Sequence, residues 1–253
     1  MGLLTSKIKC GDDSFTHHYL SPYLPLTAGK DAISLSLVKF KQRIQPDLDA
    51  WIACSADLLG NLSFSPDTII IRALRHNEIS ARPEFPCALD LLGHTLAARL
   101  HCRYLPELLS KTRPTLPGKH LTRQQRRAQL ENVYQVAAIP LIGVATPEPG
   151  TAPPPSTSPI QPTPAPQSTT TTPDPTPTPL PPTTPVLLID DILTTGATMR
   201  ALILTLRNHY PGCPIMAFTL TRADYQSPSL PLPLEGEIFP LETLKSLILA
   251  NTV

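Results

Sequence analysis

The sequence predicts an α/β fold with a doubly wound, mainly parallel sheet, an N-terminal helical segment and a disordered insertion. Short apolar runs rich in β-branched residues alternate with longer segments whose apolar residues recur every three or four positions. Such alternation of strands and helices favours a mainly parallel sheet covered by helices on both faces. With 253 residues and 41% hydrophobic content, the chain is long enough to bury a substantial core.

Residues 1–64 are predicted to form the helical N-terminal segment. The first helix is expected between residues 31 and 44, because the apolar residues there lie at helical spacing and Pro46 ends the run. Asp47 can cap a second helix, which is expected to end before Gly60.

The rest of the chain alternates strands with helices. Residues 186–189 are the clearest strand, because four apolar residues follow one another there. The next helix has an apolar face and is expected to end before Gly212; that face contains Met199, Leu202, Ile203 and Leu206. The other predicted elements are strands at residues 68–71, 132–139 and 215–220, and helices at residues 89–100 and 241–249.

Residues 145–185 differ in composition from the chain around them. This segment holds 16 of the 32 prolines and 12 threonines, but only two acidic residues. With so few large apolar side chains it cannot offset its ordering entropy by burial, so we expect an extended, disordered surface tether. An expanded loop is the interpretation we favour, and a docking site for a proline-recognising partner is the alternative. Because the segment interrupts the fold, its two ends are expected at neighbouring strand ends.

Composition and charge argue against several classes of protein. A net charge of +1 gives no global reason to expect a nucleic-acid or membrane-surface protein. The chain contains no run of about 18 apolar residues, so no membrane span is expected, and its N-terminus lacks a secretion signal. Its five cysteines are dispersed without a C-x-x-C pair, which fits reduced thiols in a cytoplasmic protein. The spacing of histidines and cysteines indicates no metal held by side chains alone.

One stretch, Val186 to Thr198, indicates a specific chemistry. Its sequence, VLLIDDILTTGAT, places two carboxylates at the end of an apolar strand, where doubly wound sheets bind ligands. Small residues around Gly196 allow a tight turn that brings backbone N–H groups together, and the following helix adds its partial positive charge. The turn suits a phosphate monoester, whereas the acids suit neighbouring hydroxyl groups or a divalent cation. A ribose 5-phosphate satisfies both requirements.

This stretch resembles the phosphoribosyl-diphosphate (PRPP) motif of type I phosphoribosyltransferases. The resemblance implies that Asp190 and Asp191 are the catalytic acids, which hold the ribose hydroxyls. It also implies a set of 5-phosphate-binding residues, which are Thr194, Thr195, Gly196, Ala197 and Thr198. The implied reaction transfers 5-phosphoribosyl from PRPP to a nitrogen nucleophile, a nucleobase or an amine, and releases pyrophosphate. Mg²⁺ is the implied cofactor; it would bridge oxygens of PRPP near the acids and would not be held by side chains alone.

Parts of the remaining chain are similar to the ComF-like, competence-associated branch of that family. The matching residues are Arg113, Thr115, Arg126, Arg127, Asn132 and Val133. On this resemblance, residues 1–64 are a hood segment, residues 65–144 and 186–253 are a phosphoribosyltransferase-like core, and residues 145–185 are the insertion. Two features depart from the branch: the cysteine-ligated zinc ribbon is absent, and the loop at residues 72–78 lacks the usual proline.

The loop after the first core strand is where this fold places its pyrophosphate site. In this chain the loop consists of Arg72, Ala73, Leu74 and Arg75. Arginine can donate two parallel hydrogen bonds to diphosphate oxygens, and backbone N–H groups can add further ones. The alternative is that Arg72 and Arg75 only cover the end of a strand.

Positive charge is concentrated between Arg99 and Arg127, where eight Lys or Arg accompany one Glu. Lys111 and Arg113 begin a segment rich in turn-forming residues, which we interpret as a cationic lid that closes over PRPP. A solvated helical face is the second interpretation. A contact surface for single-stranded DNA is the third and is not favoured, because few aromatic residues lie nearby.

Three functions fit this sequence. The leading one is a phosphoribosyltransferase, and the second is a non-catalytic regulator that binds PRPP or a nucleotide in the same pocket. The third is a ComF-like accessory protein for DNA uptake. The sequence leaves open the acceptor and the oligomeric state, for which a homodimer is one option.

Overall fold

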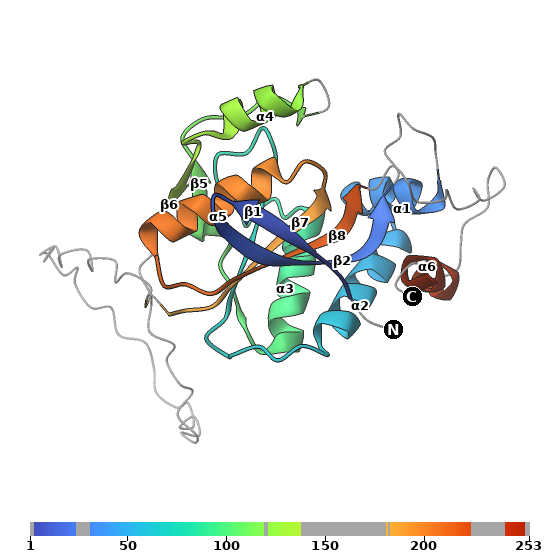
Figure 1. Cartoon of the computed structure of the whole chain (residues 1–253). Helices are drawn as coiled ribbons and strands as arrows, with labels where there is room; N and C mark the ends of the chain where they lie inside the picture. Colours follow the sequence, from blue (N-terminus) through green and yellow to red (C-terminus); the bar gives the residue numbers. More distant parts are fainter. Residues whose placement is uncertain are drawn as a thin grey trace, which may run out of the picture. The chain divides into compact units, whose positions relative to one another are not determined.

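The computed structural model describes residues 3–23, 31–118, 121–137, 181, 183–223 and 241–250 (Figure 1). The predicted insertion at residues 145–185 lies outside these residues except for Pro181 and residues 183–185. Its disorder therefore stays a prediction.

A six-stranded sheet is the centre of the fold. Its strands, in spatial order, are β1 (Leu4–Cys10), β2 (Asp13–Tyr23), β8 (Ile215–Ala223), β7 (Val186–Leu193), β3 (Ile69–Arg72) and β4 (Arg103–Tyr104). Neighbouring strands pair in parallel except for β1, which is antiparallel to β2. The prediction of an α/β fold with a mainly parallel sheet is therefore confirmed.

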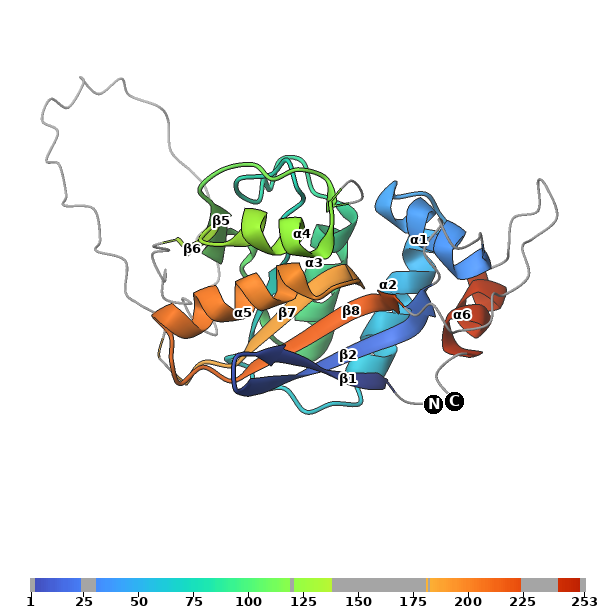
Figure 2. The same cartoon turned by 45° about the horizontal axis from the view of Figure 1, so that its top comes forward.

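Helices cover both faces of this sheet (Figures 1 and 2). The helix α5 (Ala197–His209) lies on one face and buries its predicted apolar side there, since Met199, Leu202, Ile203 and Leu206 are all nearly inaccessible. On the other face lie α2 (Asp47–Leu59) and α3 (Ala88–Leu100), whose apolar residues share one core with the sheet. Two further helices, α1 (Ala32–Lys41) and α6 (Leu241–Ala250), pack against α2.

The first 64 residues differ from the prediction of a purely helical segment. The two predicted helices are present as α1 and α2, but residues 4–23 form the hairpin β1–β2. Gly11 makes the turn with a φ of 63°, a conformation that favours glycine. Because β2 also pairs with β8, this hairpin is part of the central sheet. It was missed because β1 is an edge strand in which only Ile8 and Cys10 are buried, so little apolar alternation marks it.

Two other differences bear on the site. The strand predicted at residues 132–139 is present as β6 (Tyr134–Val136), which pairs antiparallel with β5 (Leu109–Lys111) in a separate small sheet. Strand β7 is longer than predicted, because its pairing with β8 continues as far as Leu193. Asp190 and Asp191 therefore lie within a strand, not in a loop after it.

Candidate functional site

The turn between β7 and α5 has the geometry of an anion-binding loop. Gly196 adopts a φ of 71°, and a Cβ added there would meet only Leu193, at an ordinary 3.8 Å. Glycine is therefore favoured by the backbone conformation and not by crowding. The hydrogen bond from the Arg200 amide to the Gly196 carbonyl oxygen marks the start of α5. The amides of the first turn, before Arg200, lie outside the helical hydrogen-bond pattern and are available to a ligand.

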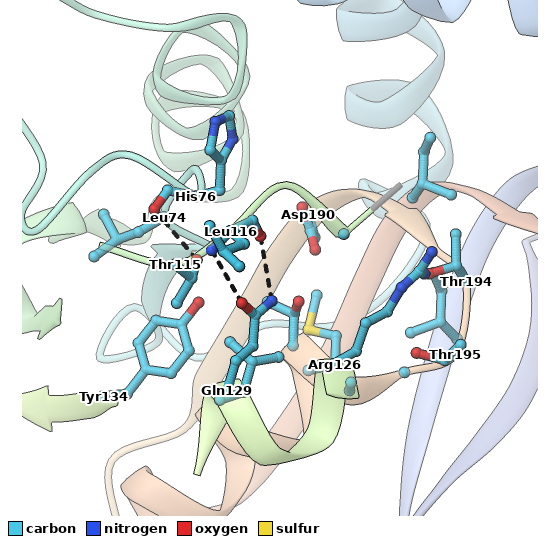
Figure 3. Close-up of a pocket in the computed structure, with 18 of the residues that line it drawn as sticks. Leu74, His76, Thr115, Leu116, Arg126, Gln129, Tyr134, Asp190, Thr194 and Thr195 are labelled. Carbon is cyan, nitrogen blue, oxygen red and sulfur yellow. Dashed lines mark hydrogen bonds between the residues drawn. The ribbon is translucent and has the colours of Figure 1, made fainter. Parts of the chain in front are cut away.

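This turn forms one wall of a cavity of about 160 Å³ (Figure 3). All five predicted phosphate-binding residues line the cavity, and so do Asp190 and Leu74. Side chains from the loop after β3 and from the segment between β5 and β6 form the other walls; they include His76, Lys111, Arg126, Gln129 and Tyr134. A volume below the 300–1,000 Å³ of typical drug-sized pockets suits a single phosphate with part of a sugar.

The two acids of the motif lie on opposite sides of β7. Successive side chains of a strand point in opposite directions, and β7 remains a strand through both acids. Asp190 consequently lines the cavity. The Asp191 carboxylate instead lies 3.0 Å from the ammonium group of Lys41, the last residue of α1. The two carboxylates therefore have separate surroundings, although they are neighbours in sequence.

Asp190 has an unusual affinity for protons. Burial and the negative charge of Asp191 raise the pKa of Asp190 to about 7. The hydrogen bond from the Asp191 amide, at 2.8 Å, and the positive charges of Lys41 and Lys111 act in the opposite direction without reversing the shift. Asp190 thus changes its charge near neutral pH, and its ionised form would be the stronger acceptor for a sugar hydroxyl.

Arg126 lies beside the turn between β7 and α5 (Figure 3). It belongs to α4 (Arg123–Leu130), whose first turn is held by a capping box between Thr122 and Gln125. The guanidinium group donates to Leu121 O at 3.2 Å and to the Thr194 hydroxyl at 3.3 Å (Figure 3). A cation is therefore placed against the turn at Gly196, where it would add to the helix N-terminus in binding an anion.

The side chain of Arg72 does not face a ligand, contrary to its assignment as a pyrophosphate-binding group. It is only 1% exposed, and its Nε donates to Asp90 at 2.5 Å while Nη1 donates to Glu78 at 2.8 Å. Asp90 also accepts from the Tyr104 hydroxyl and from the Cys87 amide at the start of α3. Arg72 therefore ties β3 to α3 and to the following loop.

The other residues assigned to the pyrophosphate loop have mixed surroundings. The amide of Ala73 donates to Ile189 O in the sheet, and the amide of Arg75 donates to Glu78 at 2.6 Å. Leu74 lines the cavity. Among these four residues, only Arg75 has an exposed side chain, so it is the one whose guanidinium is accessible to a diphosphate.

Lys111 is not part of a lid, which corrects the sequence prediction. It lies on β5, is 2% exposed, and its ammonium group donates to Leu74 O and Arg75 O at 3.3 and 2.7 Å. Burial lowers the pKa of Lys111 to about 8, although Glu78 and Asp190 act in the opposite direction. Its role is to fix the backbone of the loop after β3, as a wall of the cavity.

Arg113 and the residues after it are bonded to neighbouring segments. Arg113 donates to Gln129 O at 3.3 Å, and the amide of Thr115 donates to His76 O at 2.7 Å. Leu116 exchanges two hydrogen bonds with the Gln129 side chain (Figure 3). Thr115 and Leu116 line the cavity in the structure. Whether this segment opens and closes stays a prediction.

Three residues of the basic stretch between Arg99 and Arg127 have different surroundings. Lys111 is buried, Arg126 faces the cavity, and Arg99 lies 3.9 Å from Asp57 on α2. These three charges therefore serve separate local contacts, whereas Arg113, Arg123 and Arg127 are exposed. A nucleic-acid surface stays the interpretation that is not favoured.

Within the described ranges, no group of three or more His, Cys, Asp or Glu side chains could hold a metal ion. Magnesium often takes one or two carboxylates and completes its shell with phosphate oxygens and water. The residues around the cavity thus fit a metal ion that arrives with a diphosphate ligand. No helix in the described part of the chain has the length and apolar character needed to cross a membrane.

Comparison with known proteins supports the motif assignment. Residues 155–237 match the family model of the phosphoribosyl transferase domain. This range contains β7, the turn at Gly196, α5 and β8, which are the elements that form one side of the cavity. The match supports phosphoribosyl transfer in general and leaves the ComF-like branch without support. The search among curated proteins found no match.

Several cavity residues were not identified as site residues from the sequence. His76, Gln129 and Tyr134 line the cavity, and Lys41 pairs with Asp191. The sequence places Arg126 in the ComF-like pattern and in the basic stretch, where a solvated helical face is one interpretation, and does not indicate that it lines the cavity. The others reach the site through contacts between distant parts of the chain, which no local pattern predicts.

Proposed function

We propose that the chain binds PRPP with Mg²⁺ and transfers its 5-phosphoribosyl group to a nitrogen nucleophile, with release of pyrophosphate. The observation that carries this proposal is the cavity in which the Gly196 turn faces Arg126, with Asp190 on the adjoining wall. A phosphate monoester and a hydroxyl-bearing sugar are the two groups that such an arrangement accommodates together.

In this proposal each part of the cavity has one task. The turn at residues 194–198 and Arg126 bind the 5-phosphate, and Asp190 accepts a ribose hydroxyl. Bond cleavage at the anomeric carbon would build up positive charge on the sugar, and the nearby carboxylates would stabilise it electrostatically. The exposed Arg75, between the cavity residues Leu74 and His76, would be a cation for the leaving pyrophosphate. Mg²⁺ bound to PRPP would neutralise more of the pyrophosphate charge. We place this activity in the cytoplasm, in keeping with five cysteines that form no disulfide.

The experiment that tests the reaction is a pyrophosphate-release assay. Purified protein, PRPP and Mg²⁺ are incubated with a panel of nucleobases and with ammonia, and the variant Asp190→Asn is the control. We expect at least one acceptor to produce pyrophosphate with the wild type and none to do so above background with the variant. Equal release by the two proteins would contradict the assigned site.

A non-catalytic PRPP or nucleotide regulator is the second candidate. It is favoured by one observation: Arg72, the first residue of the assigned pyrophosphate loop, is fully engaged by Asp90 and Glu78. A site that binds the 5-phosphate more tightly than the diphosphate would fit a regulator that senses PRPP better than an enzyme. Binding of PRPP without pyrophosphate release for any acceptor would identify this function.

A further inference from the structure

Lys41 forms an ion pair that the phosphate-binding motif does not account for. Its Nζ lies 3.0 Å from Asp191 Oδ2, and the two side chains are 40% and 25% exposed. The partners are 150 positions apart in the sequence. They meet because α1 lies beyond the carboxyl ends of β7 and β8 (Figure 2).

Stability alone is a weak reason for this pair. Burial would lower the pKa of Lys41, but the charge of Asp191, its hydrogen bond and the charge of Asp190 outweigh that effect and raise it. Lys41 therefore stays positively charged at neutral pH. Because the pair is partly exposed, however, it contributes little to the stability of the fold. The contact of Lys41 with an acid of the motif therefore points to a role in the site and not in stability.

The two acids of the motif have different surroundings. Asp190 lines the cavity, whereas the Asp191 carboxylate lies 3.0 Å from the Lys41 ammonium group, beside the same stretch of β7. We propose that Lys41 is a positioning residue, which fixes the Asp191 carboxylate so that it accepts a ribose hydroxyl at the hood side of the site. This inference rests on the proposed function, because the hydroxyl belongs to PRPP.

Helix α1 offers a matched control for Lys41. Lys39 lies on the same helix, is 38% exposed, and pairs with Asp47 at 3.7 Å, away from the motif. The two lysines thus have the same chemistry, helix and exposure, but only one of them contacts an acid of the motif.

The test is calorimetric binding of PRPP with Mg²⁺ to wild type, Lys41→Met, Lys41→Arg, Lys39→Met, Asp191→Asn and the double variant Lys41→Met/Asp191→Asn. We expect Lys41→Met to weaken binding about tenfold, Lys41→Arg to restore most of the loss, and Lys39→Met to bind as the wild type does. In the Asp191→Asn background, Lys41→Met should have no further effect, because the carboxylate it positions is gone.

Thermal melts accompany every variant, and Lys41→Gln replaces Lys41→Met if the latter does not fold. Wild-type affinity in Lys41→Met, or equal losses in Lys41→Met and Lys39→Met, would overturn the assignment of Lys41 while the proposed function stands. A wild-type protein that does not bind PRPP would overturn the proposed function itself and, with it, the role of Lys41.

Discussion

Asp190 and Asp191 are chemically identical neighbours to which the structure gives different properties. Strand alternation directs one into the cavity and the other toward Lys41. Burial then makes Asp190 the acid that titrates near neutral pH. The sequence predicts which residues are involved but not this division, since it depends on whether β7 continues through the acids.

The first prediction at this scale concerns the pH dependence of binding. If the ionised Asp190 accepts a ribose hydroxyl, PRPP affinity should fall as the pH decreases through about 7, the pKa of Asp190. Asp190→Asn should bind about 10- to 100-fold more weakly at pH 8. Calorimetry between pH 6 and 8.5 measures both effects. Protonation of PRPP itself affects binding to the wild type and to Asp190→Asn equally. An identical pH profile for the two proteins would therefore contradict the role of Asp190.

A second prediction concerns His17, which is fully buried between the Ser6 and Thr219 hydroxyls, at 2.8 Å from each. Burial lowers the pKa of His17 to about 4. Below pH 6.5 the unfolded chain therefore binds a proton that the folded chain does not, and stability should fall by up to about 3 kcal/mol as the pH decreases from 6.5 to 4.

Urea unfolding at several pH values tests this prediction, because the difference between wild type and His17→Gln isolates the one histidine. The variant should be less stable at pH 7 but lose less stability on acidification. The same acid dependence in both proteins would show that His17 does not stay neutral in the fold.

At the scale of elements, local sequence patterns account for much of the fold. Strands β3, β7 and β8 and the helix α5 follow from apolar runs and helical spacing. The hairpin β1–β2 was missed because the inner face of β1 carries few large apolar residues, with Ser6 between Leu4 and Ile8. Arg72 was assigned to ligand binding because it follows a predicted strand, and Lys111 because turn-forming residues follow it. Both are buried, because their partners lie in other parts of the chain.

The contact between α3 and β4 gives a prediction at this scale. A Cβ at Gly93 would lie 2.2 Å from the ring of Tyr104, so Gly93→Ala must displace the ring and its hydrogen bond to Asp90. We expect a loss of about 1–3 kcal/mol in the free energy of unfolding. Gly118→Ala is the control, since its added methyl meets Arg126 at an ordinary 3.5 Å. Equal stability of the two variants would contradict the packing at Gly93.

At the scale of the whole molecule, the cavity depends on residues far apart in the chain. The loop after β3, the segment from β5 to β6 and the motif turn meet there, although the segment at residues 138–180 separates the last from the others. Sequence reasoning found the turn because its function is local. It could not place Arg126 or Tyr134 opposite that turn, because their position follows from tertiary packing.

The central claim is that the Gly196 turn binds the phosphate of a ribose 5-phosphate group. Amide NMR of the ¹⁵N-labelled protein during titration with PRPP and Mg²⁺ tests it most directly. We predict that the largest shifts occur at the amides of Thr195 to Met199, with smaller ones at Asp190 and Arg126. Saturable binding that leaves the amides of residues 195–199 unshifted, or no binding at millimolar PRPP, would contradict it.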